Sequence, residues 1–264
     1  MFTGFFKTIF IFHRMTIYYL KSFDKRNQIH TLKKQFSIEV LTILGFKIKT
    51  LGEPVLKNKL ILVGNHISYL DILVVLVAHP ESVFLAKSEV SQWALIGSVA
   101  KKIGTLFVVR NSKNSRVKIK EQIVKILNST TTSLQIAGFP SGTTTLSEEK
   151  PWKKGLFEIA QSTQIHIQPF RISYSHPREC AYIDDDQLFS CLINLFQLKN
   201  KEIYFEWGKS FQVTDLLKQI ESTRIWTQKI DLPQFESFKP GQKSDRDKMS
   251  YVKSEQLALE QLQS

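Results

Sequence analysis

A histidine and an aspartate five positions apart can form a hydrogen-bonded acid–base pair in this chain. Residues 64–71 read Gly-Asn-His-Ile-Ser-Tyr-Leu-Asp and follow an apolar run at 59–64, so His66 and Asp71 flank a predicted strand-to-helix turn. A carboxylate that accepts a hydrogen bond from one imidazole nitrogen fixes the tautomer and leaves the other nitrogen as a general base. A purely structural role is the alternative, with Ser68 as a helix N-cap and Asp71 in the first helical turn.

The elements that must position this pair alternate along the chain. Short apolar, β-branched runs predict strands at 46–50, 59–64, 83–86, 105–109, 133–139, 165–172 and 202–206. Helical patterns lie between several of them, at 70–77, 92–102, 115–128 and 154–161. This alternation predicts an α/β fold with a mixed, largely parallel sheet of about seven strands flanked by helices. Sites in such sheets gather at the carboxyl ends of strands, so we expect chemistry in the loops after Gly64, Val109 and Phe139.

Composition limits the classes of protein and of partner. The 264 residues carry a formal net charge of +12, and 42% of them are hydrophobic, which excludes a disordered chain, a collagen-like repeat and a disulfide-stapled mini-protein. Cys180 and Cys191 are the only cysteines, and we interpret them as reduced thiols. The excess of cations indicates an anionic partner, either nucleic acid or an anionic membrane surface.

The two ends of the chain differ from its middle. Residues 2–23 are rich in aromatic side chains but contain Lys7, Arg14 and Lys21, a pattern typical of a helix lying in the membrane interface rather than spanning the bilayer. Packing on the soluble core is the alternative for this helix. A second helix is predicted at 31–44, with Gly45 as its stop. We therefore expect membrane-associating helices at 1–45, a catalytic domain at 46–230 and a polar tail at 231–264.

Several blocks together resemble the glycerolipid acyltransferase family, and specifically its 1-acyl-glycerol-3-phosphate (lysophosphatidic acid) acyltransferases. The segment 63–71 matches the His-x4-Asp block, and residues 86–89 with 103–110 resemble the second block. Residues 139–143, Phe-Pro-Ser-Gly-Thr, stand where the family has Phe-Pro-Glu-Gly-Thr. Trp-Lys-Lys-Gly at 152–155 and the run at 165–172 around Pro169 resemble later blocks, in order and at compatible spacings.

The resemblance implies a role for each candidate residue. His66 is the base and Asp71 orients it, while Lys87 and Arg110 hold the phosphate of the acceptor through charge-assisted bonds. A turn at 139–143 is implied to offer backbone N–H groups and a hydroxyl to that phosphate. Its members are Phe139, Pro140, Ser141, Gly142 and Thr143. An acyl thioester already has a good leaving group, so neither a metal, a cofactor nor a covalent intermediate is expected.

Two positions depart from the family pattern. Ser141 replaces the usual Glu and Thr144 replaces the usual Arg, which changes how the acceptor is recognised. A different lyso-lipid acceptor is therefore an alternative, and an inactive relative is another. The serine-hydrolase pattern is not met, because in 138–142 the Ser stands one residue late for Gly-x-Ser-x-Gly. No nucleotide-binding signature or metal-ligand spacing is present.

The expected activity is transfer of an acyl group from acyl-CoA or acyl-carrier protein to 1-acyl-glycerol-3-phosphate, giving phosphatidic acid in phospholipid biosynthesis. The implied partners are the lyso-glycerophospholipid, the acyl thioester and an anionic membrane surface. We expect a monotopic protein on the cytoplasmic face of the inner or plasma membrane. A non-catalytic binder of anionic lipid or of nucleic acid is the alternative from another class, although the scattered cations match no nucleic-acid module.

Overall fold

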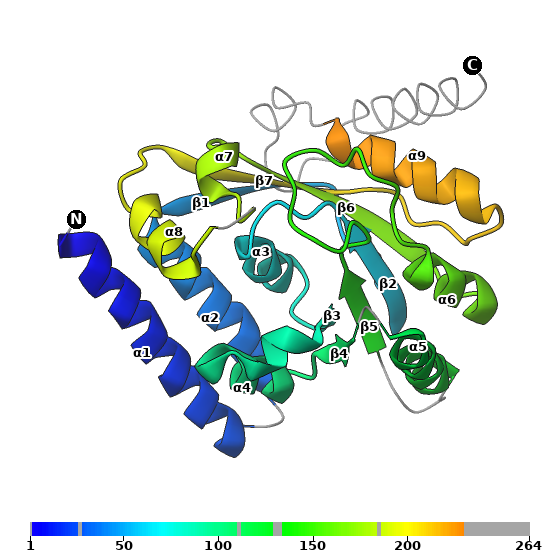
Figure 1. Cartoon of the computed structure of the whole chain (residues 1–264), viewed down its shortest axis with the longest axis horizontal. Coiled ribbons are helices and arrows are strands. Elements are labelled where there is room, and N and C mark those ends of the chain that lie inside the picture. Colours follow the sequence, from blue (N-terminus) through cyan, green and yellow to red (C-terminus); the bar gives the residue numbers. More distant parts are fainter. Residues whose placement is uncertain (1, 26–27, 110–111, 129–133, 184–185, 230–264) are drawn as a thin grey trace.

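A single seven-stranded sheet forms the centre of the molecule (Figure 1). The computed structural model describes residues 2–25, 28–109, 112–128, 134–183 and 186–229. The strand order is β1-β7-β6-β2-β5-β3-β4, and every neighbouring pair is parallel except β6 with β7. The strands are β1 (Phe46–Leu51), β2 (Lys59–Gly64), β3 (Ser82–Lys87), β4 (Leu106–Val108), β5 (Leu134–Gly138), β6 (Ile167–Tyr174) and β7 (Lys201–Trp207). The predicted fold class, a mixed and largely parallel sheet of about seven strands, is confirmed.

Helices cover both faces of the sheet and so bury the central strands completely. The helices are α1 (Phe2–Asp24), α2 (Ile29–Leu44), α3 (Leu70–Ala78), α4 (Ala94–Lys102), α5 (Lys113–Asn128), α6 (Gly155–Thr163), α7 (Pro177–Cys180), α8 (Leu188–Leu195) and α9 (Leu216–Gln228). Along β2, Leu60 and Leu62 face the core that α2 and α3 cover, whereas Ile61 and Val63 face the core under α5 and α6. All four side chains are fully buried, as expected where successive residues of a strand point to opposite covered faces.

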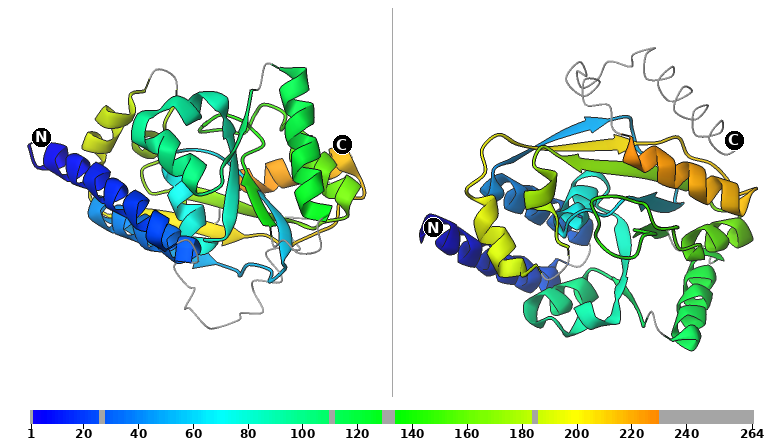
Figure 2. Two further views of the ribbon diagram at one scale, coloured as in Figure 1. Left: turned by 90° about the horizontal axis from the view of Figure 1, so that it is seen from below. Right: turned by 45° about the horizontal axis from the view of Figure 1, so that its top comes forward.

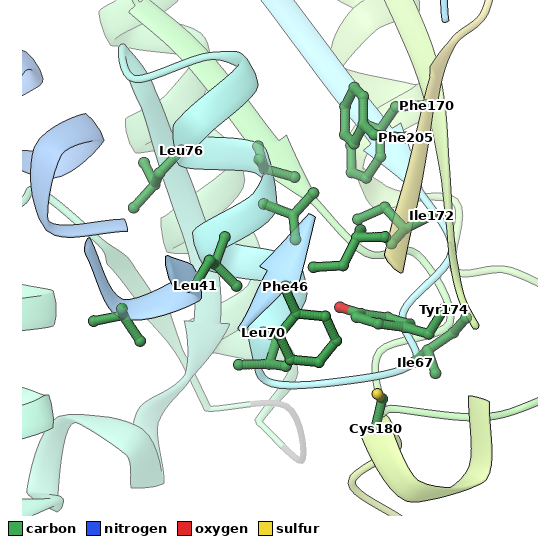
Figure 3. Packing of buried hydrophobic residues seen from close by; sticks show 14 of the residues in the cluster. Leu41, Phe46, Ile67, Leu70, Leu76, Phe170, Ile172, Tyr174, Cys180 and Phe205 are labelled. Atoms are coloured by element: carbon green, nitrogen blue, oxygen red, sulfur yellow. The ribbon is translucent and has the colours of Figure 1, made fainter. Parts of the chain in front are cut away.

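The larger of these two cores lies directly beneath the loop that follows β2. Figure 3 shows Ile67 and Leu70 from that loop and α3 beside Phe46, Ile172 and Tyr174 from β1 and β6. Gly64, the last residue of β2, lets the β6 backbone and side chain approach closely, because an added Cβ would lie 2.3 Å from the Phe170 ring. The loop therefore starts from a rigidly packed point of the sheet.

The first helix lies along the outside of the domain beside α2 (Figures 1 and 2). Arg14 of α1 forms an ion pair with Glu39 of α2, and the Tyr18 hydroxyl donates to the same carboxylate at 3.0 Å. Thr8 and Ile11 are buried against the domain. The predicted stop of α2 is confirmed, because Gly45 adopts a left-handed conformation at its C-cap with φ 82°.

Some elements differ from the sequence expectation. The helix predicted at 92–102 begins at Ala94, because residues 88–92 form a short 3-10 helix, η2 (Ser88–Gln92). The helices α7, α8 and α9 were not predicted. In α9 the buried positions are Ile220, Thr223, Trp226 and Thr227, and two of these are polar, so its apolar stripe is weak in the sequence. The predicted tail at 231–264 lies outside the described residues.

Candidate functional site

The imidazole of His66 is hydrogen-bonded to the carboxylate of Asp71. The distance from Nδ1 to Oδ2 is 2.8 Å, and the two residues come from the loop after β2 and the first turn of α3. The Asp71 side chain is fully buried, whereas 17% of the His66 side chain is exposed. Because Nδ1 faces the carboxylate, Nε2 is the nitrogen that remains for exchange of a proton with a substrate.

The carboxylate of Asp71 is saturated with donors, which explains how a buried charge is tolerated. Oδ2 also accepts the backbone N–H groups of Ile67 at 2.7 Å and Ser68 at 2.9 Å. Oδ1 accepts the hydroxyl of Tyr174 at 2.5 Å. A buried carboxylate with this number of hydrogen bonds has one orientation, so the imidazole that it binds is also oriented.

Tyr174 reaches Asp71 from the end of β6 and was missed by the sequence analysis. Burial, followed by the neighbouring Asp71 charge, raises the pKa of Tyr174 well above its ordinary value, so the phenol stays a donor. Figure 3 shows its ring within the hydrophobic cluster, between Ile172 and Cys180. The residue stands two positions beyond the last family-like block at 165–172, and nothing in its sequence context distinguishes it from a core tyrosine.

The His66 ring is also held across its face. It stacks on the ring of Phe139, with centroids 4.0 Å apart and planes 10° from parallel. Phe139 in turn contacts Phe84 and Phe170, which belong to β3 and β6. Phe139 directly follows β5, which neighbours β2 in the sheet, so the two carboxyl ends bring these rings together.

The loop after β2 is anchored in the sheet by Asn65. Its amide nitrogen donates to the carbonyl of Ile172 at 2.8 Å, and its amide oxygen accepts the N–H of the same residue at 2.8 Å. The neighbouring Ser68 hydroxyl accepts the N–H of Leu70 at 3.2 Å. The N-cap residue of α3 is Tyr69 and not Ser68, whereas Asp71 lies in the first turn as considered. The first-turn position of Asp71 does not exclude its pairing with His66.

The segment 139–143 forms the expected turn. The N–H of Gly142 donates to the carbonyl of Phe139 at 2.9 Å, and Gly142 takes φ 77°, a conformation that favours glycine. The Ser141 hydroxyl donates to the carbonyl of Thr143 at 3.0 Å, while the carbonyl of Pro140 accepts the N–H of Lys153 at 2.9 Å. These contacts are all within the chain. Substrate binding by Ser141, Gly142 and Thr143 therefore stays a prediction.

Of the two residues predicted to bind the acceptor's phosphate, Lys87 lies in the described part of the chain and Arg110 does not. Lys87 is the last residue of β3 and is exposed. Because β2, β5 and β3 run parallel, Lys87 lies at the same end of the sheet as His66, the carboxyl end of these strands. Arg110 lies outside the described residues. The structure thus brings His66, Asp71 and Phe139 into contact, and it places Lys87 at the same carboxyl end of the sheet.

A second carboxylate, Glu148, contacts His66 and was also missed. Its Oε1 accepts the backbone N–H of His66 at 3.2 Å, and its side chain is buried. Its context in the sequence, Ser-Glu-Glu-Lys in a polar loop, is typical of an exposed residue. No group of three or more His, Cys, Asp or Glu in the described part of the chain is arranged to hold a metal ion.

The sequence matches a known class of transferase. Residues 47–173 match the sequence model of the family described as Acyltransferase. The 1-acyl-sn-glycerophosphate (LPA) acyltransferase from Thermotoga maritima has the same fold, with a TM-score of 0.62 over 92% of this chain and 99% of that one, at 14% identity.

The curated relatives that match this chain include two kinds of lipid acyltransferase. A lyso-ornithine lipid O-acyltransferase from Pseudomonas aeruginosa is 32% identical over 168 residues, which are 62% of this chain and 63% of that protein. A 1-acyl-sn-glycerol-3-phosphate acyltransferase from Neisseria gonorrhoeae is 30% identical over 104 residues, 39% of each chain. The match to the first of these relatives thus spans less than two thirds of its length. The resemblance predicted from the sequence blocks is confirmed.

Proposed function

We propose that this protein is a lysolipid O-acyltransferase in which His66 is the general base. The observation that carries the proposal is the hydrogen bond between His66 Nδ1 and Asp71 Oδ2, at 2.8 Å, in a chain whose residues 47–173 match the sequence model of the acyltransferase family. A serine or cysteine nucleophile is not required, because a thioester is already activated toward attack by an alcohol.

The reaction is a direct transfer in one addition and one elimination. His66 Nε2 takes the proton of the acceptor hydroxyl as its oxygen attacks the thioester carbonyl. The carbon–sulfur bond then breaks, the thiolate leaves, and the imidazolium returns the proton to sulfur. Asp71 stabilises the imidazolium during this cycle and keeps Nε2 facing the substrate. No metal or cofactor takes part, and the donor is acyl-CoA or acyl-carrier protein.

Two acceptors are candidates, and different residues support each of them. 1-Acyl-glycerol-3-phosphate carries a phosphate that Lys87 and Arg110 would bind, as the family blocks imply. A lyso-ornithine lipid carries an ornithine headgroup, with one ammonium and one carboxylate group, and no phosphate. Thr144 favours this second acceptor, because it removes the family's guanidinium from the turn, and four matching relatives are named lyso-ornithine lipid O-acyltransferase.

The acceptor is a lipid, so the protein is expected to work at a membrane surface. No helix in the described ranges is both long and apolar enough to cross a bilayer. The exposed side of α1 carries large apolar side chains, including Phe6 (61% exposed), Phe10 (48%) and Leu20 (59%). With the net charge of +12, this side favours peripheral binding to an anionic cytoplasmic leaflet.

One experiment tests the activity and separates the acceptors. The purified protein is given 1-acyl-glycerol-3-phosphate or a lyso-ornithine lipid, each with acyl-CoA and with acyl-carrier protein, and His66→Ala is the blank. Turnover that disappears in His66→Ala supports the proposal, and the acceptor with the higher kcat/KM identifies the substrate. Undiminished turnover in His66→Ala would refute the mechanism, and lipid or nucleic-acid binding without turnover would favour the non-catalytic alternative.

A further inference from the structure

A buried carboxylate contacts the backbone of His66, whereas Asp71 contacts its ring. Glu148, in the loop between β5 and α6, is 4% exposed. Its Oε1 accepts the N–H of His66 at 3.2 Å, and its Oε2 accepts the indole N–H of Trp152 at 2.7 Å. Both oxygens thus face N–H donors, which is the arrangement that suits an ionised carboxylate.

The carboxylate is held in place from a third element. Arg224 of α9 donates from its guanidinium to the backbone carbonyl of Glu148, and Gln228 donates to the same carbonyl at 3.4 Å. Arg224 is itself paired with Glu221 one turn earlier in α9. A glutamate that is fixed at its backbone and at both carboxylate oxygens cannot turn toward solvent.

The same loop also binds the other backbone group of His66. The N–H of Thr145 donates to the carbonyl of His66 at 2.7 Å. Residues 145–148 therefore hold the peptide groups on both sides of the His66 Cα, while Asp71 and Phe139 hold its ring.

We propose that Glu148 is a positioning residue for His66 and that its negative charge stabilises the imidazolium formed when His66 takes the acceptor's proton. This inference rests on the function proposed above. Charged and titratable groups approach His66 from each packed element: Asp71 from α3, Tyr174 from β6 through Asp71, Glu148 from the loop, and Arg224 from α9 through Glu148. Of these, Asp71 and Glu148 bring negative charge into direct hydrogen-bonded contact with His66.

Burial acts against the ionised form of Glu148. It raises the pKa of the carboxyl, and the hydrogen bonds from Trp152 and from the His66 N–H oppose this rise. Burial of an ionised glutamate costs stability, and an apolar side chain would fill the same space without that cost. A role at His66 therefore explains Glu148 better than packing does.

The test must separate the charge of Glu148 from its hydrogen bonds. Gln has a single carbonyl oxygen, so Glu148→Gln in the wild-type chain leaves one of the two N–H donors without an acceptor. Trp152→Phe removes one donor, and in that background the Gln oxygen still serves the N–H of His66. The comparison of Trp152→Phe with Trp152→Phe/Glu148→Gln therefore reports the loss of charge while the hydrogen bond to the His66 N–H is kept. Glu149→Gln is the matched control, because Glu149 is the neighbouring carboxylate and is exposed.

In the double variant we expect kcat to fall about tenfold relative to Trp152→Phe, equivalent to about 1.4 kcal/mol in the barrier. KM should stay within about twofold, because Glu148 is buried and its oxygens face N–H groups of the chain itself. The acid limb of the pH profile of kcat/KM should move to lower pH, since removal of an anion makes protonation of the base less favourable. Glu149→Gln should change none of these quantities.

A readout without turnover distinguishes this inference from the proposed function. Diethyl pyrocarbonate modifies neutral imidazole, and mass spectrometry of the His66 peptide gives the pH of half-maximal modification. That pH should also fall in the double variant. An unchanged kcat, or a rise in KM alone, would overturn the role of Glu148 while His66→Ala still abolishes transfer. If no acceptor is acylated by the wild type, the function fails, and an unchanged modification midpoint would overturn the inference as well.

Discussion

The imidazole of His66 lies flat against the ring of Phe139, with centroids 4.0 Å apart and planes 10° from parallel. The hydrogen bond that His66 Nδ1 donates to Asp71 fixes the edge of the imidazole, and the Phe139 ring fixes its face. Together the two contacts leave the histidine one orientation, with Nε2 directed away from Asp71. A base held in this way needs no rearrangement before it meets the hydroxyl of an acceptor.

Replacement of Asp71 by Asn should lower kcat on the order of a thousandfold, with little change in KM. The Asn oxygen can still accept from Ile67, Ser68 and His66, but the negative charge that stabilises the imidazolium is lost. Steady-state kinetics with the better of the two acceptors measures the effect. A circular-dichroism spectrum and a Tm close to those of the wild type are the control, and a kcat near that of the wild type would contradict the assignment.

Thr144→Arg should move acceptor preference toward 1-acyl-glycerol-3-phosphate. In the structure the Thr144 hydroxyl donates to the carbonyl of Tyr182, so this side chain serves the fold. A guanidinium at this position would form a charge-assisted pair with a phosphate and would gain less from an ornithine headgroup, whose carboxylate is accompanied by an ammonium. The ratio of the two kcat/KM values should therefore rise about tenfold. Thr144→Val loses the hydroxyl without gaining charge, and it should leave the ratio unchanged. Equal kcat/KM ratios in the Arg and Val variants would show that position 144 does not determine which acceptor headgroup is preferred.

Phe6→Ser/Phe10→Ser should weaken binding to anionic vesicles by at least about tenfold in a sedimentation assay. Both rings lie on the exposed side of α1, so their loss removes apolar surface from the membrane contact without opening the core. Deletion of the whole helix is a poorer test, because Ile11 and the Arg14–Glu39 ion pair belong to the packed side.

The matched control for this prediction is Leu217→Ser in α9. Leu217 is 72% exposed, and α9 lies on the other side of the domain from α1 (Figure 1). Its substitution should leave vesicle binding unchanged. Equal losses in both variants would show that binding follows general surface hydrophobicity and not the α1 face.

Lys33 should give the free energy of unfolding a distinct dependence on alkaline pH. This lysine of α2 donates to the carbonyl of Ser82 at 2.9 Å, and burial lowers its pKa to about 8, while Glu81 opposes the shift. Between about pH 8 and its ordinary pKa of 10.5, the folded chain binds fewer protons at this site than the unfolded chain. The contribution of Lys33 to stability therefore rises with pH across that window, by about 3 kcal/mol in total.

Lys33→Met should abolish this contribution, which urea unfolding at a series of pH values measures. Lys34→Met is the control, because Lys34 is the adjacent and exposed lysine and should leave the pH dependence unchanged. If the Lys33 variant keeps the wild-type slope between pH 8 and 10.5, the ionised form of Lys33 is not disfavoured in the folded protein.

The strands and the His66–Asp71 pair were predictable because their signals are local. Apolar runs fixed the strands to within two residues at each end, and the pair lies only five positions apart in one turn. Tyr174 and Glu148 were not predictable, because they stand 103 residues from Asp71 and 82 from His66 in sequence. Only the sheet order and the path of the β5–α6 loop bring them to the pair. The helix α9 was missed for a related reason, since it buries polar Thr223 and Thr227 beside Ile220 and Trp226.

The ion pair between Arg14 and Glu39 has a consequence for how the enzyme would meet its substrate. Because α1 packs along α2 and is paired with it, a bilayer that binds the exposed side of α1 would also set the orientation of the sheet and its distance from the membrane surface. The acceptor then arrives by two-dimensional diffusion within the leaflet. The turnover rate would follow the mole fraction of lysolipid in the membrane, and inert lipid added at constant total acceptor would slow it by surface dilution.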